Sequence, residues 1–383
     1  MTWSYRIATI RGIDLKVHAT FAIIVLLAAA NWSDLGPIGM AFGVGLILLL
    51  FGCVTLHEFG HAIAAQRYGI PVREIVLLPI GGLAVLGRNT RHPVQELVIA
   101  AAGPAVNVAI IALLVPVLYL IGEPVTLSPA FLRPDGATPS LVDALHWLLG
   151  ANVSLVLFNL IPAFPLDGGR MVRGLLGLVM DWPKATRWAA TTGQTLALGM
   201  GTWGLVGGQL TLVLIAMLIF VAASATDADE RAHTVLSTQR VGDACNRHAI
   251  ALSEGDRVGA VIRYLLTSYQ PDFPVLRGPR LLGVVRRSQV LAAVAHRAGD
   301  LPVTEIMTAC PAVSADLSLA ETRSLFQESG ATVAAVVHDG NFIGLVSAED
   351  IAEAETVLAF VRAGSPGRPS HRAPRQSPAP AGA

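Results

Sequence analysis

Two histidines and a glutamate lie within five residues of one another in a strongly apolar part of the chain, in the segment His57-Glu58-Phe59-Gly60-His61. In an α-helix, side chains four residues apart lie on the same face, so the two imidazoles can bind one metal ion. Glu58 follows the first histidine by about 100° around the helix. There a carboxylate can act as general base for a water molecule that zinc activates. The spacing therefore predicts a hydrolytic zinc site.

A simpler interpretation of this segment needs no metal. Soluble helices carry His and Glu on solvated faces, and at the end of a membrane helix such side chains can extend into water. A charged group near the centre of a membrane helix costs about 2.5 to 3.5 kcal/mol on insertion scales. Three ionisable residues inside a span therefore favour a compensating metal ion, and the segment alone leaves the helix-end alternative open.

The composition places much of the chain in a membrane. Its residues are 53% hydrophobic and only 14% charged, whereas soluble proteins have about 25% charged residues. Six apolar segments approach the roughly 20 residues that a spanning helix needs. They cover 17–32, 39–66, 96–122, 141–161, 187–206 and 209–226. We expect an α-helical polytopic membrane protein with about six transmembrane helices in residues 1–230. The fifth segment is rich in glycine and polar residues, so a half-buried or broken helix is also consistent with it.

Lys and Arg in the short loops predict the orientation, because they favour the cytoplasmic side. One set of loops contains eleven of them, whereas the opposite set contains only Arg133. The eleven are Arg6, Arg11, Lys16, Arg67, Arg73, Arg88, Arg91, Arg170, Arg173, Lys184 and Arg187. The first apolar run has no signal-peptide cleavage pattern, so we expect it to be retained. We expect a multi-pass protein of the cell membrane with both termini in the cytoplasm.

This topology brings a third candidate ligand to the depth of the two histidines. A catalytic zinc usually has three protein ligands, and Asp167 lies just past the fourth segment in the run NLIPAFPLDGGR, residues 159–170. On its own, Asp-Gly can simply form a turn. The second and fourth segments both end on the cytoplasmic side, so His57, His61 and Asp167 are expected at one depth.

Two asparagines and an interrupted apolar stretch complete the candidate site. Asn107 and Asn159 lie in apolar helices, where an amide can hold a substrate backbone or donate to a developing oxyanion. The alternative is an interhelical hydrogen bond, worth about 0.6 kcal/mol. Residues 72–87 are apolar and β-branched but broken by one proline and two glycines. They predict a β-hairpin or re-entrant loop whose edge strand aligns an unwound substrate.

Charge and cysteine patterns exclude other classes of protein. The formal net charge is zero and no basic block stands out, so we expect no nucleic-acid partner. Cys53, Cys245 and Cys310 are scattered without CxxC spacing. They give neither a disulfide framework nor a thiolate zinc site.

The C-terminal third has the composition of a soluble protein and contains an internal repeat, with one copy in residues 236–295 and the other in 301–357. Repeats of this kind usually form paired modules that complete one core together. Residues 364–383 are rich in Pro, Gly, Ser and Arg and almost free of apolar residues. They predict a disordered tail.

Three motifs together resemble the site-2 protease family of membrane zinc metalloproteases, in its prokaryotic branch that ends in CBS domains. They are HEFGH, the run Gly103-Pro104-Ala105-Val106-Asn107, and NLIPAFPLDGGR. The resemblance extends from the first helix to about residue 357. It implies that His57, His61 and Asp167 bind one Zn²⁺ and that Glu58 is the general base. It also implies a membrane-protein substrate with a transmembrane helix, such as an anti-sigma factor or a similar regulator.

Each repeat is similar to a CBS domain, which implies an α/β CBS domain pair with clefts for adenosine ligands. In the second repeat, residues 344–350 (GLVSAED) match the nucleotide-binding pattern, in which the carboxylate holds the ribose hydroxyls. The first repeat has GVVRRSQ at residues 283–289 and lacks the acid. The resemblance therefore implies at most one adenine-nucleotide site, with Ser347 and Asp350. The alternative is a packing module, for instance in a homodimer.

Two other functions stay open from the sequence. CBS pairs also occur on transport proteins, so a CBS-regulated metal-ion transporter is one alternative. A transporter needs polar groups along a continuous path, whereas here they cluster at one depth. A catalytically inactive scaffold that binds membrane helices is the second alternative, and the intact HExxH segment and Asp167 count against it.

Overall fold

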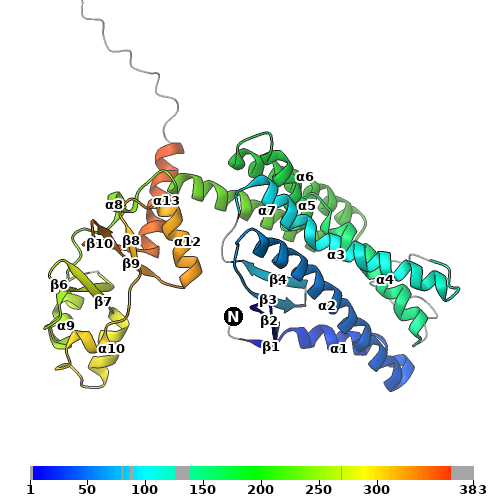
Figure 1. The fold of residues 1–383 in the computed structure, drawn as a ribbon, viewed down its shortest axis with the longest axis horizontal. Coiled ribbons are helices and arrows are strands. Elements are labelled where there is room, and N and C mark those ends of the chain that lie inside the picture. The colour runs from blue at the N-terminus through cyan, green and yellow to red at the C-terminus, as the bar shows by residue number, and fades with distance from the viewer. Residues whose placement is uncertain (1–2, 80, 87–89, 126–138, 269, 364–383) are drawn as a thin grey trace, which may run out of the picture. The chain divides into compact units, whose positions relative to one another are not determined.

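The chain folds into two compact units, Met1–Glu230 and Arg231–Ala383 (Figure 1). The structure is a computed structural model that describes residues 3–79, 81–86, 90–125, 139–268 and 270–363. The predicted tail, residues 364–383, lies outside the described residues.

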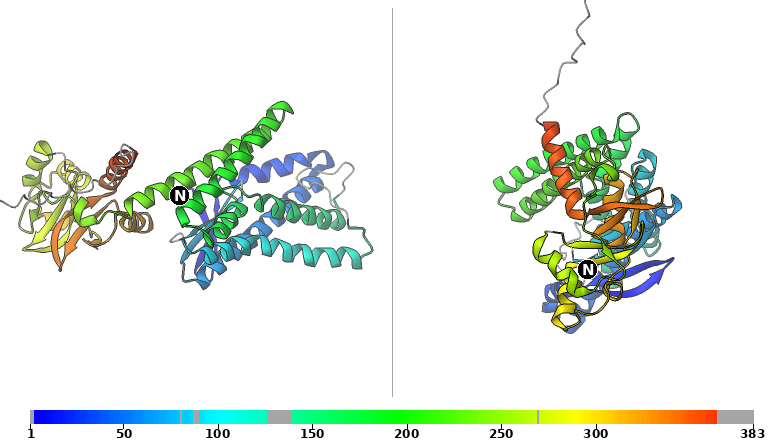
Figure 2. Two further views of the ribbon diagram at one scale, coloured as in Figure 1. Left: turned by 90° about the horizontal axis from the view of Figure 1, so that it is seen from above. Right: turned by 90° about the vertical axis from the view of Figure 1, so that its left-hand side faces the viewer.

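Seven α-helices begin in the described residues of the first unit, and the last of them ends at Leu236, beyond the boundary at Glu230. They are α1 Phe21–Asn31, α2 Gly36–Arg67, α3 Pro93–Leu120, α4 Leu141–Asn159, α5 Asp167–Gly177, α6 Trp182–Val206 and α7 Leu210–Leu236, and a short 3-10 helix, η1, covers Ser33–Leu35. The helices α2, α3 and α4 pack against one another in succession (Figure 2). Helix α5 packs on α3, so the chain that follows α4 returns to α3.

Helices lie at all six positions predicted to span the membrane, but the described part of the chain contains only four that are long and apolar enough to do so: α2 with η1, α3, α4 and α7. The segment 17–32, predicted as a single span, is only partly helical. Its start belongs to a strand, and α1 has 11 residues, or about 16 Å of helix, against a hydrocarbon core of about 30 Å. Helix α6 is continuous but too polar to meet the same criterion.

A four-stranded sheet lies against α2 in the first unit. Its strands are β1 Ser4–Ile10, β2 Ile13–His18, β3 Val72–Leu78 and β4 Gly81–Leu86, in the order β1-β2-β3-β4. The predicted hairpin at 72–87 is therefore present, with Leu78 paired to Gly81 at its turn. The hairpin β1-β2 was not predicted from the sequence. Its polar and apolar residues alternate, and its turn has Arg11 and Gly12 at φ 53° and 80°, as two-residue hairpin loops require.

The sheet and α2 share one apolar core that fixes the face α2 presents to the other helices. Phe59, Ala62 and Ala65 of α2 pack with Ile75 and Leu77 of β3 in this core. Phe59 lies between the two histidines in sequence, so burying it against the sheet turns His57 and His61 to a different side of the helix.

The second unit contains two modules of the same topology. Each has a three-stranded sheet in which a short first strand runs parallel to the second and the second is antiparallel to the third. The first comprises α8 Val241–Ala244, β5 Leu252–Ser253, α9 Val258–Thr267, β6 Asp272–Arg277, β7 Arg280–Arg286 and α10 Arg287–Ala295. The second comprises α11 Val303–Ile306, β8 Ala312–Ser314, α12 Leu319–Ser329, β9 Val333–His338, β10 Asn341–Ser347 and α13 Ala348–Ala363.

The two modules complete each other. Asn246, which precedes the first sheet, forms a bridge to Leu345 of β10, and Thr308, which precedes the second sheet, forms the equivalent bridge to Val284 of β7. Val284 and Leu345 also share a buried apolar cluster with Ala335 of β9. This reciprocal pairing explains why the repeat occurs twice, since each sheet gains backbone partners from the other copy.

Candidate metal centre

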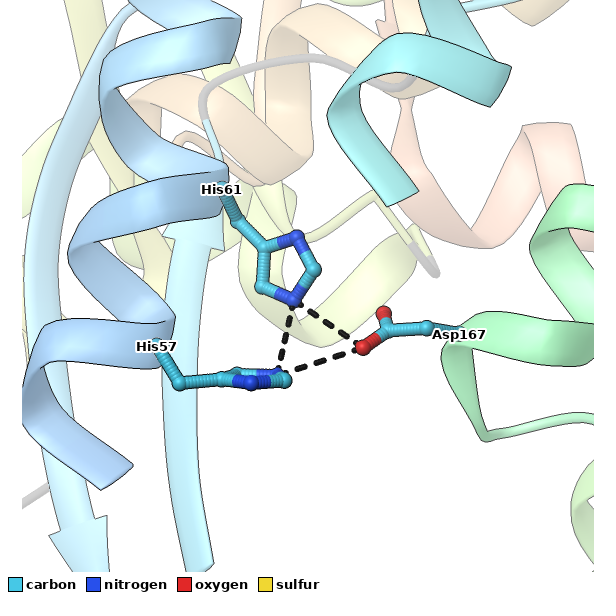
Figure 3. A group of neighbouring side chains, drawn as sticks. All are labelled: His57, His61 and Asp167. Carbon is cyan, nitrogen blue, oxygen red and sulfur yellow. Dashed lines mark hydrogen bonds and ion pairs between the residues drawn. The ribbon is translucent and has the colours of Figure 1, made fainter. Parts of the chain in front are cut away.

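His57, His61 and Asp167 converge on one point in the first unit (Figure 3). The Nε2 atoms of the two imidazoles are 3.1 Å apart. Asp167 Oδ2 lies 3.2 Å from Nε2 of His57 and 3.1 Å from Nε2 of His61. All three residues are at most 7% exposed. The structure thus brings two neighbouring turns of α2 to the first residue of α5, across more than one hundred residues of sequence.

The tautomer of His61 follows from its other ring nitrogen. Its Nδ1 lies 2.7 Å from the backbone carbonyl of Ile99 on α3, and a carbonyl oxygen can only accept. The proton is therefore on Nδ1, and the lone pair of Nε2 faces Asp167. Sequence reasoning missed this contact, because a backbone acceptor leaves no trace in side-chain spacing.

The tautomer of His57 is fixed by a chain of amides that ends on another carbonyl. Asn152 donates to the Leu148 carbonyl at 2.9 Å, which turns its oxygen toward the amide nitrogen of Asn107 at 2.9 Å. The Asn107 oxygen then faces His57 Nδ1 at 2.5 Å, so this nitrogen must donate. Both imidazoles consequently direct Nε2 lone pairs at the same carboxylate oxygen.

Three electron-pair donors at these separations fit a bound zinc ion. Tetrahedral zinc with bonds of about 2.0 Å separates its ligand atoms by about 3.3 Å, and the three distances here are 3.1, 3.1 and 3.2 Å. When both imidazoles are neutral, their Nε2 lone pairs and the carboxylate face one another, and a metal cation between them would satisfy all three. Two nitrogens and an oxygen are also a typical catalytic donor set for zinc.

Glycines leave the space that this group occupies. A Cβ atom on Gly103 of α3 would lie 2.2 Å from His61 Nε2 and 2.7 Å from His57 Nε2, so any side chain there would fill the ligand position. A Cβ on Gly168 would lie 2.3 Å from the Ile161 carbonyl. The glycine after Asp167 thus lets α5 begin directly against the preceding chain and holds Asp167 in place.

Glu58 is half-buried beside the three ligands. Its electrostatic neighbours include His57, His61 and Asp167. A Cβ atom on Gly82 of β4 would lie 2.5 Å from Glu58 Cγ, so the glutamate packs against the backbone of the edge strand. The structure therefore places the predicted general base between the ligand group and β4.

The two asparagines differ in what they contact. Asn107 is fully buried, and the ends of its amide are engaged by His57 and Asn152. The structure supports a role for Asn107 in orienting His57. Asn159 donates to the Leu155 carbonyl of its own helix at 3.0 Å. Roles for both in binding substrate or the oxyanion stay predictions.

Ser347 and Asp350 form a reciprocal cap at the start of α13. The Ser347 backbone N–H donates to Asp350 Oδ2 at 2.7 Å, and the Asp350 N–H donates to Ser347 Oγ at 3.0 Å. Gln289 makes the corresponding bond to the Arg286 N–H in the first module, at 2.8 Å. The pattern that predicted a nucleotide site thus has a structural role, and nucleotide binding stays a prediction.

Comparison with known proteins gives two family matches. The sequence profile of peptidase family M50 matches residues 45–145 and 120–200, which include all three ligand residues. The profile of the CBS domain matches residues 303–356, which lie in the second module.

Individual relatives resemble most of the chain. The zinc metalloprotease MJ0392 of Methanocaldococcus jannaschii is 28% identical over 358 residues, covering 94% of this chain and 98% of the relative. Rip3 of Mycobacterium tuberculosis is 29% identical over 375 residues, covering 90% of each. A solved structure, the site-2 protease from Methanocaldococcus jannaschii, is 34% identical, with 59% of this chain and 95% of that chain covered and a TM-score of 0.42.

Proposed function

The chain is a zinc metalloprotease of peptidase family M50, the site-2 proteases, with a multi-pass membrane unit and a CBS domain pair, and we propose that it hydrolyses peptide bonds in the transmembrane segments of other membrane proteins. The observation that carries the proposal is the convergence of His57, His61 and Asp167 within 3.2 Å of one another inside that unit. Water is scarce there, so a peptide bond would be cleaved only by a site that activates a specific water molecule.

The ligand group and Glu58 divide the chemistry between them. Zinc held by the three residues would supply a Lewis acid for the scissile carbonyl and would lower the pKa of a bound water molecule to about 7. Glu58 accepts the proton from the attacking water and passes it to the leaving amine, so water and one peptide bond become a carboxylic acid and an amine. The hydrogen bonds at Nδ1 keep both imidazoles oriented throughout.

The edge strand β4 is suited to align the substrate. It is the last strand of the sheet, so one of its edges has no strand partner among the described residues. An unwound peptide can add to such an edge through backbone hydrogen bonds. Gly82 of this strand contacts Glu58, so a peptide paired here would pass the general base and the ligand group.

Cleavage of a panel of single-span membrane proteins by the purified protein tests this function, with the Glu58→Gln variant as control. An anti-sigma factor or a similar membrane regulator belongs in the panel as the substrate class expected from the family. Cleavage by the native protein alone supports the proposal, and equal cleavage by both proteins contradicts the role of Glu58.

Metal transport is the competing function. The group formed by His57, His61 and Asp167 is the one His/Cys/Asp/Glu cluster of metal-binding geometry among the described residues, whereas a transport path needs several sites in series. An inert scaffold is the other alternative. Zinc uptake into proteoliposomes that exceeds one ion per chain would favour transport, and zinc binding without cleavage of any substrate would favour the scaffold.

We also propose an orientation for the protein in the membrane. The eleven Lys and Arg residues on one side support cytoplasmic termini and a cytoplasmic CBS pair. Labelling of single-cysteine variants in intact cells would test this orientation.

We expect the CBS pair to modulate cleavage through an adenine nucleotide near Asp350 or through homodimer contacts. Titration of the whole protein with ATP, AMP and S-adenosylmethionine tests this, and absence of binding at millimolar ligand supports a packing module.

A further inference from the structure

A fully buried acid on α3 holds two arginines of α5. Glu96 is 2% exposed, and its Oε1 accepts from Arg170 Nε at 3.2 Å and from Arg173 Nη2 at 2.5 Å. Charged groups are rare in membrane units and need partners. The two guanidinium groups supply them, so this cluster ties the start of α3 to α5, the helix that begins with Asp167.

The two arginines differ in what else they contact. Arg173 lies over the rings of Phe164 and Trp182, at 5.1 and 4.9 Å from their centroids. Arg170 lies on the side of α5 that carries Asp167, because residues three apart share a helix face. Its Nη1 is 3.8 Å from Asp167 Oδ1.

The two oxygens of Asp167 therefore have separate neighbours. Oδ2 faces both imidazoles, whereas Oδ1 faces the guanidinium of Arg170. A carboxylate at the first residue of a short helix can bind a metal through either oxygen or through both. A fixed cation beside Oδ1 favours the arrangement in which Oδ2 alone points to the metal.

We propose that Arg170 is a positioning residue for the metal ligand Asp167, and that Glu96 is the anchor that keeps its guanidinium in place. The inference rests on the proposed function only in taking Asp167 as a ligand. Arg170 acts through the carboxylate and does not touch the metal position. Lysine keeps the charge but lacks the planar fork, so it cannot reach Glu96 and Asp167 at the same time.

Arg173 provides a matched comparison. It belongs to the same helix and bonds to the same oxygen of Glu96, but it stacks on aromatic rings instead of facing Asp167. Arg170→Lys and Arg173→Lys both weaken the link between α3 and α5. Only the first removes a contact of the ligand carboxylate.

The test uses the full-length protein loaded with cobalt, whose visible absorption reports ligand geometry. We expect Arg170→Lys to weaken metal affinity by about 10- to 100-fold in chelator competition and to change the cobalt spectrum. Arg173→Lys should keep the wild-type affinity and spectrum while lowering the unfolding temperature. Glu96→Gln keeps the size of the side chain and should shift the cobalt spectrum in the same direction as Arg170→Lys. It therefore tests the same positioning role if Arg170→Lys does not fold.

The outcomes separate this inference from the proposed function. Wild-type affinity and spectrum in Arg170→Lys, or equal changes in both lysine variants, would overturn the positioning role while leaving the metal site intact. A wild-type protein that binds no cobalt would overturn the ligand assignment itself and the inference with it.

Discussion

The two units each place an aspartate at the start of a helix but use it differently. Asp350 in the CBS pair turns Oδ2 onto the backbone N–H of Ser347, next to its own helix. Asp167 in the membrane unit turns Oδ2 toward two imidazoles of another helix. A carboxylate that caps its own helix is satisfied without a ligand, whereas one that faces lone pairs needs a cation. The groups that each carboxylate oxygen faces, more than the motif around the aspartate, therefore indicate which of the two could bind a metal ion.

Burial of polar groups follows the same contrast. Nine polar or charged residues are buried among the described residues, and eight of them lie in the membrane unit. The exception is Thr322, in the second CBS module. Burying a polar group costs free energy unless the group is hydrogen-bonded or paired. The buried polar residues on α2, α3 and α5 therefore indicate a functional site in this part of the molecule.

The largest expected effect comes from exchanging the two aspartates for alanine. Asp167→Ala removes an anionic ligand, so we expect the zinc content to fall from one ion per chain to near zero and cleavage to be lost. Asp350→Ala should retain the full zinc content. Metal analysis of both purified variants makes the comparison, and equal zinc in the two would contradict it.

Glu58→Gln should separate catalysis from metal binding. Loss of a general base slows turnover by about 10²- to 10⁴-fold, while zinc content should stay at the wild-type level because Glu58 is not a ligand. Single-turnover cleavage rates and metal analysis on the same preparation check this. Loss of zinc in this variant would mean that Glu58 supports the ligand set instead.

Gly82→Ala should displace Glu58 without touching the ligands. The new Cβ would lie 2.5 Å from Glu58 Cγ, so the side chain must move, and a displacement of that order costs about 10²-fold in rate. Gly52→Ala is the matched control, since a Cβ at Gly52 meets nothing within 4 Å. A bulkier substitution of Gly81 and Gly82 together extends the test to strand addition. Normal turnover with these replacements would contradict the proposal that β4 positions Glu58 and the substrate.

Asn107→Ala should loosen His57 and weaken zinc affinity by about 10- to 100-fold. Asn159→Ala is the comparison, because Asn159 bonds within its own helix and should leave zinc affinity unchanged. Competition with a chelator of known affinity measures both. An equal effect of the two substitutions would argue against the orienting role of Asn107.

The smallest effect is expected in the CBS pair. Ser347→Ala removes a helix cap and should lower the free energy of unfolding of that unit by about 1 kcal/mol. Calorimetry follows this change, while cleavage and zinc content should not respond. A large drop in cleavage would instead link the cap to regulation.

The sequence predicted that His57, His61 and Asp167 lie at one depth, because HExxH spacing puts the two histidines on one helix face and the topology brings Asp167 to the same side. It also predicted the hairpin at 72–87 and the repeated soluble modules. It missed the hairpin β1-β2, whose last residues, 17 and 18, were assigned to the apolar segment that follows. It could not reveal the Ile99 carbonyl or the space left by Gly103, since both depend on how α2 packs on α3. The isolated acid Glu96 in an apolar helix was the available signal for the Arg170 cluster.

X-ray absorption at the zinc edge of the purified protein tests the central claim most directly. A centre made by His57, His61 and Asp167 predicts two imidazole nitrogens and light oxygen donors at about 2.0 to 2.2 Å, in four-coordinate geometry. Sulfur in the coordination shell, or zinc without imidazole scattering, would contradict the site.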